Sequence, residues 1–440
     1  MNNDFESTPR WSRRGLLGLL AMPSIGIART LERSSDPLDA ALAALVNDKA
    51  CPLASVSVLV RRAGHVIYEG QFGRRHIEPD LPVTPDTLFR MASVTKLFVA
   101  VAAMRLVDAG MLDLDVDIGK LLGYPLRHSR HPDVPISARL LLTHRSGLSD
   151  AGDDYLDART DLRALGASAW SVHAPGGWFE YANLNFALLA AVLERVTGQR
   201  FDRLMQAWVF DPLGIQGGFD PARLQSSQLA QVATLYRKAP SDAGPWDPTG
   251  RWHAQADDFS AAPPEPLVRD DTASYEPGSR AALFGPQGRL RTRVRDLGTM
   301  MAMLLNGGRH EGQVFLQPQT VRALMSESWR ANGLEGADAN GDTDGGIFQA
   351  WGLGMQHFID RSRGHWGDRL RPEGGIEAWG HLGFAYGLVS GLLVDPRRGC
   401  GIAYAISGTG ADPEQNPGTY SSFPTWEERL QALLWARALA

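Results

Sequence analysis

Runs of apolar residues near both ends of the chain predict β-strands. Residues 55–60 and 65–72 flank a turn-forming Arg-Arg-Ala-Gly stretch, and residues 385–394 and 401–406 flank Asp-Pro-Arg-Arg-Gly. The chain between these two pairs carries mainly helical patterns. We therefore expect an α+β fold, in which one antiparallel sheet is built from both chain ends, is flanked by helices, and has a mostly helical middle region.

Apolar periodicity also predicts the main helices. Residues 93–109 are apolar on nearly every side and end at Gly110, and a helix without a polar face is expected to be buried. Residues 184–196 form a second helix of the same kind. A last helix begins at Thr425, whose spacing to Glu428 fits a capping box.

Two long segments predict irregular structure instead. Residues 238–280 are rich in Pro, Asp and Ala, and residues 330–346 are rich in Gly and Asp. Residues 338–349 resemble a calcium loop, but they lack the glycine at the sixth position and the glutamate at the twelfth. His128 and His131 lie among prolines and arginines without a supporting carboxylate pattern. We expect neither a metal site nor a cofactor.

The first residues are typical of a secretory signal. Arg13-Arg14 precedes an apolar stretch, residues 16–27, that ends in small residues. The stretch is shorter than the roughly 20 residues that span a bilayer, and no later segment reaches transmembrane length. We expect residues 1–28 to be a twin-arginine signal peptide for export to the periplasm, and residues 29–440 to form the functional domain. A frayed terminal helix with two chance arginines is the alternative.

Composition narrows the choice of partners. The formal net charge of −5 provides no basic surface for nucleic acid, and 44% hydrophobic with 21% charged residues is ordinary for a soluble globular protein. Cys51 and Cys400 could pair in an oxidising compartment. Both precede predicted strands, however, and antiparallel neighbours would place those strand beginnings at opposite ends, so the pairing stays open.

The first candidate for chemistry is the pair Ser93 and Lys96. It is the one place where a serine is followed three residues later by a lysine, in a chain with only four lysines. Positions i and i+3 share a helix face. Burial in an apolar helix lowers a lysine pKa, so a neutral amine could take the serine proton, and free N–H groups at the helix start could bind an oxyanion. A helix cap with a surface lysine is the alternative.

The second candidate is Tyr181 with Asn183. Of nine tyrosines, Tyr181 is the one with an asparagine two residues later, and it lies in a loop just before a predicted helix. A phenolate beside Lys96 could act as general base, first for the serine and then for water. Asn183 could hold a substrate amide.

Together these motifs resemble the serine β-lactamase and penicillin-binding family, in the branch of class C enzymes, DD-carboxypeptidases, esterases and D-aminopeptidases. The resemblance runs from about residue 40 to the C-terminus. It includes residues 87–92, 141–148, 179–183, 194–198, 288–297 and 304–308. It implies a β-lactamase/transpeptidase-like fold.

The third motif of that family, Lys-Thr-Gly, does not occur in the chain. The candidate replacement is His381-Leu382-Gly383, because a strand is predicted to follow it. Residues 310–312 and 365–367 have the same His-x-Gly pattern, but the first lies in a turn-rich stretch and the second is followed by charged residues. By resemblance, the backbone N–H of Phe384 would be the second oxyanion donor. Because the charge of a histidine at neutral pH is optional, tight recognition of a substrate carboxylate is in doubt.

The sequence thus predicts a serine hydrolase acting through an acyl-enzyme on a small-molecule or peptide substrate with an ester, amide or lactam carbonyl. The sequence contains no Gly-x-Ser-x-Gly motif, which counts against an α/β-hydrolase. A penicillin- or peptidoglycan-binding sensor with little or no turnover is the alternative function. Whether the substrate is an ester, a peptide or a β-lactam, and the oligomeric state, are left open.

Overall fold

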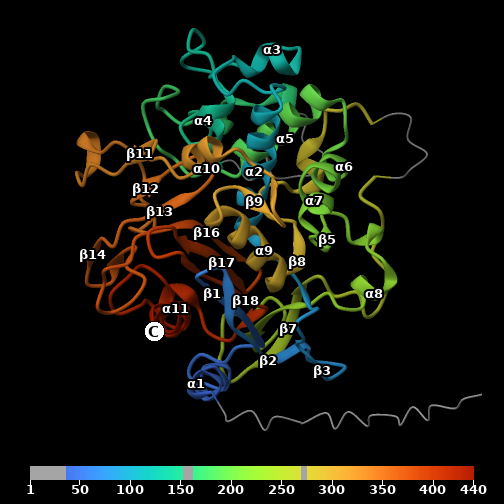
Figure 1. The fold of residues 1–440 in the computed structure, drawn as a ribbon, viewed down its shortest axis with the longest axis vertical. Coiled ribbons are helices and arrows are strands. Elements are labelled where there is room, and N and C mark those ends of the chain that lie inside the picture. The colour runs from blue at the N-terminus through green and yellow to red at the C-terminus, as the bar shows by residue number, and fades with distance from the viewer. Residues whose placement is uncertain (1–35, 152–161, 269–274) are drawn as a thin grey trace, which may run out of the picture. The chain divides into compact units, whose positions relative to one another are not determined.

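The computed structural model describes residues 36–151, 162–268 and 275–440 (Figure 1). The predicted signal segment, residues 1–28, lies outside the described residues. The unit that carries the fold spans Pro37–Ala440.

A mainly antiparallel sheet is the centre of this unit, and nine described strands form it in the order β11-β12-β13-β16-β17-β18-β1-β2-β3. The strands are β1 (Ser55–Arg62), β2 (His65–His76), β3 (Leu81–Pro82), β11 (Trp329–Arg330), β12 (Ala350–Trp351), β13 (Gln356–Phe358), β16 (Ala378–Ala385), β17 (Leu388–Asp395) and β18 (Cys400–Ile406). Strand β1 pairs with β2 on one side and with β18, from the far end of the chain, on the other. The predicted α+β fold with a sheet built from both chain ends is confirmed.

Helices cover both faces of this sheet. The described α-helices are α1 (Pro37–Val46), α2 (Thr95–Asp108), α3 (Ile118–Leu122), α4 (Ala138–Leu142), α5 (Leu184–Thr197), α6 (Phe201–Met205), α7 (Asp211–Leu213), α8 (Ser226–Leu229), α9 (Val294–Leu305), α10 (Pro318–Leu324) and α11 (Thr425–Leu439). Because side chains alternate along a strand, Val58 and Val60 of β1 point to one face of the sheet. They pack there in a hydrophobic cluster that also contains residues of α1 and α11. Leu59 packs in the other cluster, with α9 and α2. In Figure 1, α3, α4 and α5 lie at the end of the view opposite α1.

Smaller sheets surround the main one. They contain β4 (Leu88–Arg90), β5 (Gly217–Gly218) and β8 (Arg291–Arg293); β6 (Leu235–Ala239), β7 (Arg251–Ala256) and β19 (Gly408–Thr409); β9 (Arg309–His310) and β10 (Gln313–Val314); and β14 (Ser362–Arg363) and β15 (Trp366–Gly367). The expectation of irregular structure over residues 238–280 is therefore wrong at its start, because β6 pairs with β7 across a loop of that segment.

The single strand predicted over residues 385–394 is in fact one arm of a hairpin. Strands β16 and β17 are joined at Tyr386 and Gly387, whose φ angles are +56° and +81°. Positive φ at both central residues is the turn geometry that matches the twist of paired strands. The apolar run hid this turn, and His381 consequently lies within β16 rather than before a strand.

The capping box predicted at the start of α11 is also wrong. Thr425 Oγ1 donates to the carbonyl groups of Asn416 and Pro417. The Glu428 carboxylate accepts from the backbone N–H of Thr419 and from the Ser421 hydroxyl, among others. Both side chains hold the preceding loop against the helix instead of capping the helix itself.

The two cysteines are free and buried. Cys400 lies opposite Arg62, at the end of β1, whereas Cys51 precedes the start of β1. The antiparallel pairing of β1 with β18 thus separates them, which settles the question that the sequence left open. Among the described residues, no helix has the length and apolarity needed to cross a membrane.

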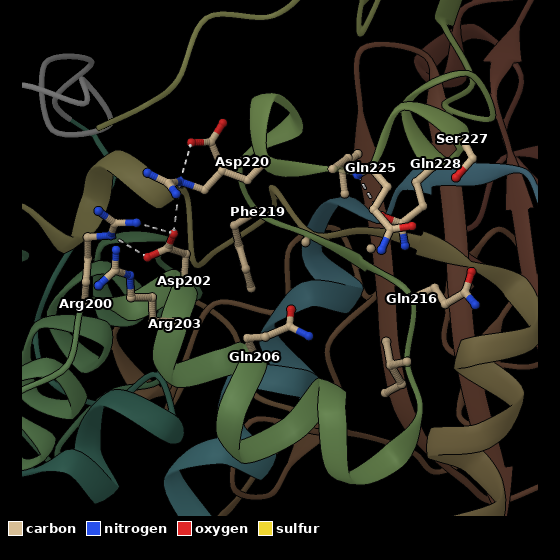
Figure 2. Close-up of a pocket in the computed structure, with 15 residues that line it drawn as sticks. Arg200, Asp202, Arg203, Gln206, Gln216, Phe219, Asp220, Gln225, Ser227 and Gln228 are labelled. Atoms are coloured by element: carbon tan, nitrogen blue, oxygen red, sulfur yellow. Dashed lines mark hydrogen bonds and ion pairs between the residues drawn. The ribbon is translucent and has the colours of Figure 1, made fainter. Parts of the chain in front are cut away.

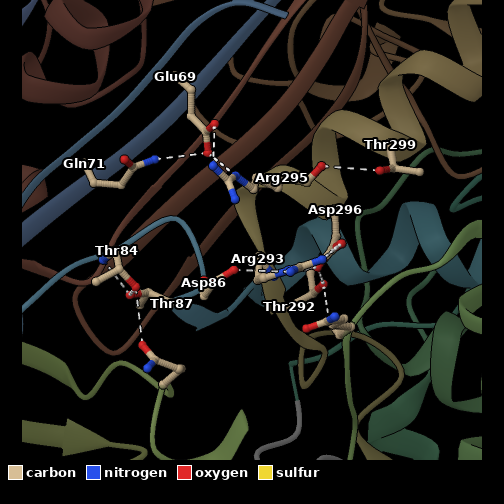
Figure 3. A network of polar contacts seen from close by, with 12 residues as sticks. Glu69, Gln71, Thr84, Asp86, Thr87, Thr292, Arg293, Arg295, Asp296 and Thr299 are labelled. Carbon is tan, nitrogen blue, oxygen red and sulfur yellow. Dashed lines mark hydrogen bonds and ion pairs between the residues drawn. The ribbon is translucent and has the colours of Figure 1, made fainter. Parts of the chain in front are cut away.

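A polar network ties α9 to the strands that lead to Ser93 (Figure 3). Arg293 binds Asp296 through both Nε and Nη2, at 2.9 and 2.8 Å, and Asp86 at 3.4 Å. Arg295 binds Glu69 of β2 through two nitrogens. Because β8 also pairs with β4, this network holds in place the segment from which the chain enters the Ser93 turn.

Candidate active site

Ser93 and Lys96 lie where the 3₁₀ turn η1 (Ala92–Val94) runs into α2. Lys96 is fully buried, and its Nζ lies 3.0 Å from Ser93 Oγ. The same nitrogen lies 2.7 Å from Asn183 Oδ1 and 2.9 Å from the carbonyl oxygen of Gln287. The structure therefore brings three of the predicted residues together around one amine.

Burial lowers the pKa of Lys96 to about 7, although Asp150 acts in the opposite direction. A neutral amine has two N–H donors and one lone pair. Asn183 Oδ1 and the Gln287 carbonyl are acceptors and take the two N–H groups. The lone pair then faces the Ser93 hydroxyl, which is the arrangement that a general base needs.

Tyr181 completes the group from the loop before α5. Its ring is held between His144, with centroids 4.5 Å apart, and Phe348, with centroids 4.8 Å apart. Lys96 Nζ lies 4.9 Å from the ring centroid. Burial raises the pKa of Tyr181, although the nearby Ser93 side chain acts in the opposite direction, so the phenol is protonated at neutral pH. A phenol in this state can pass a proton on, and Lys96 is the better base.

Two further residues position this loop, and that role was predicted from the sequence for neither of them. Asp150 accepts from the backbone N–H of Asn183 at 2.6 Å and of Leu184 at 3.1 Å, so it caps the start of α5. His144 Nδ1 accepts from the backbone N–H of Ala182 at 3.1 Å. Burial, Lys96 and His381 all lower the pKa of His144, which keeps its imidazole neutral. In the sequence, His144 is distinguished only by lying within residues 141–148, a segment that resembles the family.

Strand β16 brings the third motif beside Ser93. A Cβ added to Gly383 would lie 3.0 Å from the Ser93 nitrogen and 2.6 Å from the Met91 carbonyl oxygen, so the strand and the turn are in close contact. Ser390 of β17 donates to the same Met91 carbonyl at 2.8 Å. Phe384 follows Gly383 at the open end of the strand, with 54% of its surface exposed.

His381 is neutral in this setting. Burial and the nearby Lys96 lower the pKa of its imidazole to about 3. Nδ1 lies 2.6 Å from the carbonyl oxygen of Leu382, to which it donates. A neutral imidazole offers no positive charge to a substrate carboxylate, as the absence of a lysine in the motif led us to expect.

Strained backbone accompanies these contacts. Ala92, His144 and Tyr386 all have φ between +43° and +56°. This conformation costs an L-residue about 1 kcal/mol or more, and it persists where the surroundings impose it. Ala92 immediately precedes Ser93, His144 stacks on Tyr181, and Tyr386 lies in the β16–β17 turn.

The close approach at Gly383 leads to a prediction. We expect Gly383→Ala to lower kcat by a factor of about 10² to 10³, the cost of losing one oxyanion donor, because the methyl group pushes β16 away from Ser93. Ester hydrolysis and circular dichroism of the purified variant check this. Gly218→Ala is the control, since an added Cβ there meets nothing closer than 3.9 Å. Unchanged kcat in Gly383→Ala would contradict the placement of β16.

The predicted catalytic residues open into a cleft of about 450 Å³. Its lining residues come from the catalytic group, β16, the segment after residue 343 and the segment that leads into α11. They include Ser93, Tyr181, Asn183, His381, Gly383 and Phe384. All the predicted site residues except Lys96 thus line one cleft, and Lys96 lies beneath it.

A second cavity, of about 650 Å³, lies beside α6 and α8 (Figure 2). Arg200 binds Asp202 through two nitrogens, at 2.7 and 2.8 Å. Arg223 lies 3.5 Å from Asp220. Aspartates therefore compensate these two arginines, and no predicted catalytic residue lines the cavity. Across the described ranges, no group of three or more His, Cys, Asp or Glu side chains could hold a metal ion.

A sheet built from both chain ends, with a serine, a lysine and a tyrosine converging beside it, defines the β-lactamase and transpeptidase-like class. A family model described as Beta-lactamase matches residues 38–421, and the chain belongs to this family.

Comparison with known proteins agrees with this assignment. Esterase EstB of Burkholderia gladioli is 36% identical over 183 residues, which are 37% of this chain and 46% of the relative. The D-aminopeptidase of Gluconobacter oxydans (strain 621H) is 32% identical over 193 residues, 41% of this chain and 34% of the relative. The chain thus spans less than half the length of these two relatives. Penicillin-binding protein 4 of Amycolatopsis lactamdurans is 27% identical, with 83% of each chain covered.

Solved structures show the same fold. D-amino acid amidase from Ochrobactrum anthropi SV3 matches with a TM-score of 0.61 at 20% identity, over 91% of this chain and 98% of that one. The octameric penicillin-binding protein homologue from Pyrococcus abyssi has the same TM-score and identity, over 91% of this chain and 77% of that one.

Proposed function

We propose that the protein is a serine hydrolase that cleaves ester or amide bonds through an acyl-enzyme on Ser93. The observation that carries the proposal is the set of hydrogen bonds around Lys96, which leaves the lone pair of its neutral amine for the Ser93 hydroxyl. In acylation, Ser93 Oγ attacks the substrate carbonyl carbon while its proton moves to Lys96 Nζ. The developing oxyanion is held by the backbone N–H groups of Ser93 and Phe384.

The remaining proton transfers use Tyr181. Its phenol gives a proton to the leaving alcohol or amine and recovers one from Lys96, so the leaving group departs neutral. Water then attacks the acyl carbonyl, its proton returns through Tyr181 and Lys96, and Ser93 is released with its hydroxyl restored. The reaction needs no cofactor.

The surroundings of the site favour esters and amides over substrates that must be held by a carboxylate. His381 is neutral, and Asn183 uses its oxygen for Lys96, so its amide nitrogen is the group left to donate to a substrate carbonyl. An esterase and a D-aminopeptidase are among the relatives. A broad β-lactamase-like esterase or peptidase fits this combination best.

A substrate panel tests the proposal. The wild-type protein and Ser93→Ala are assayed with p-nitrophenyl esters, D-amino acid amides and nitrocefin. We expect turnover of at least one of the first two classes, dependent on Ser93. A permanent Ser93 adduct with a penicillin probe and no turnover of any substrate would instead indicate the sensor.

We also propose export through the twin-arginine route, on the basis of Arg13-Arg14 and the apolar stretch after it. In a host with that pathway, we expect the wild-type chain in the periplasm with residues 1–28 removed. The double variant Arg13→Lys, Arg14→Lys should accumulate as a cytoplasmic precursor. Fractionation and N-terminal sequencing check this, and equal periplasmic recovery of both forms would contradict it.

A further inference from the structure

The catalytic cleft continues past the open edge of β16. Strand β13 pairs with β16 from Ala378 to Gly380, and in the described residues that side of β16 has no strand partner beyond Gly380. The cleft crosses there from Ser93 toward the first turn of α11, where Phe423, Pro424 and Glu427 line it. The catalytic mechanism uses none of these three residues.

Glu427 is a fixed and buried carboxylate in this extension, with 6% of its surface exposed. Tyr404 of β18 donates its hydroxyl proton to Glu427 Oε1 at 2.5 Å, and Gln431 Nε2 donates to the Tyr404 oxygen at 2.9 Å. No arginine, lysine or histidine of the described chain forms an ion pair with Glu427. Burial therefore raises the pKa of Glu427 to about 7, and the carboxylate predominates at pH 8. A buried carboxylate without a cationic partner is costly, so a bound cation would stabilise the ionised form.

The rest of the cleft favours the same kind of ligand. Its acidic lining consists of Glu427 with the exposed Asp344 and Glu414, and within the described ranges neither lysine nor arginine lines it. His381 adds a separate observation. It is 2% exposed and lines the cleft, Nδ1 donates to the Leu382 carbonyl, and the remaining Nε2 lone pair has no partner among the described residues. The unused groups are therefore acceptors and negative charges, which match a donor-rich cation.

We infer that this cleft selects substrates that carry an ammonium group, with Glu427 as the specificity-determining residue that binds it while the reacting carbonyl lies at Ser93. The inference rests on the proposed hydrolase function. It names the substrate class as esters or amides with a primary amine on either the acyl or the leaving-group side. Substrates with a free carboxylate are excluded by the same charges.

Matched pairs of esters test this at pH 8. The acyl-side pair is p-nitrophenyl 6-aminohexanoate and p-nitrophenyl hexanoate. The leaving-group pair is 4-(aminomethyl)phenyl butyrate and 4-methylphenyl butyrate. For at least one pair we expect kcat/KM to favour the ammonium ester by about tenfold or more, the worth of a hydrogen bond between charged groups. In Glu427→Gln this ratio should fall to near one through KM, whereas Glu335→Gln, an exposed control outside this cleft, should keep it.

A second measurement does not depend on the folding of a variant. Benzylammonium should inhibit the wild-type hydrolysis of p-nitrophenyl hexanoate competitively, and benzyl alcohol should not at equal concentration. If the neutral esters are hydrolysed but neither pair shows an ammonium preference, or if the preference survives Glu427→Gln, the inference is overturned and the hydrolase function stands. If no ester is hydrolysed and Ser93 cannot be labelled, the proposed function itself fails, and the inference with it.

Discussion

Replacing Ser93 with alanine should lower kcat/KM for every substrate of the protein by a factor of about 10⁵ or more, the loss seen when a serine nucleophile is removed. Lys96, Tyr181 and the oxyanion donors remain in this variant, but no nucleophile is left to form the acyl-enzyme. The missing hydroxyl also removes a hydrogen-bond partner 3.0 Å from Lys96 Nζ, but the amine keeps its two carbonyl-type partners. We therefore expect an inactive protein that remains folded.

The measurement is steady-state hydrolysis of the best ester of the panel, with the melting temperature recorded in parallel. Ser227→Ala, at an exposed serine beside the second cavity of Figure 2, is the matched control and should keep full activity. Activity of Ser93→Ala within tenfold of the wild type would show that another residue is the nucleophile.

Replacing Lys96 with arginine should lower kcat/KM by a factor of about 10³, within the range for the loss of a general base. Arginine stays protonated and positively charged at all working pH values, so it cannot accept the serine proton. Lys120→Arg is the control at an exposed lysine. Small primary amines added to Lys96→Ala should restore part of the activity, because they can supply the missing base.

The pH profile gives the same test in the wild-type protein. The neutral amine of Lys96 is the active form, and its pKa is lowered to about 7. We therefore expect kcat/KM to rise with pH through about 7 and then to level off. Lys96→Arg should lack this rise. A wild-type rate that falls as the pH increases through 7 would mean that Lys96 acts as a cation instead.

Much of the fold could be predicted because its strands are buried and apolar. Residues 55–60 and 401–406 became β1 and β18, which pair with each other. The errors arose where the apolar pattern does not show the position of a turn or the partner of a hydrogen bond. The turn residues Tyr386 and Gly387 lie inside a mainly apolar run and are not marked by charged residues. The hairpin between β16 and β17 was therefore missed. The spacing of Thr425 was right for a capping box, but the preceding loop took its hydrogen bonds.

The site could be predicted to the extent that its residues lie in short motifs. Ser93 and Lys96 are three residues apart, and Tyr181 and Asn183 are two apart, so each pair could be selected within one local segment. Asp150, by contrast, acts on backbone groups more than 30 residues away. The base role of Tyr181 depends on its burial, which raises the pKa of the phenol and shifts that role to Lys96. Neither contact distances nor burial could be read from spacing.

The most direct test of the account is to trap the acyl-enzyme and locate it. The wild-type protein is mixed with p-nitrophenyl hexanoate, quenched in acid within milliseconds and digested, and the peptides are analysed by mass spectrometry. We predict one hexanoyl group on Ser93, present in the first turnover and gone once the ester is consumed. An acyl group on any residue other than Ser93 would contradict the account. So would a quenched burst of one p-nitrophenol per protein in which no peptide is acylated.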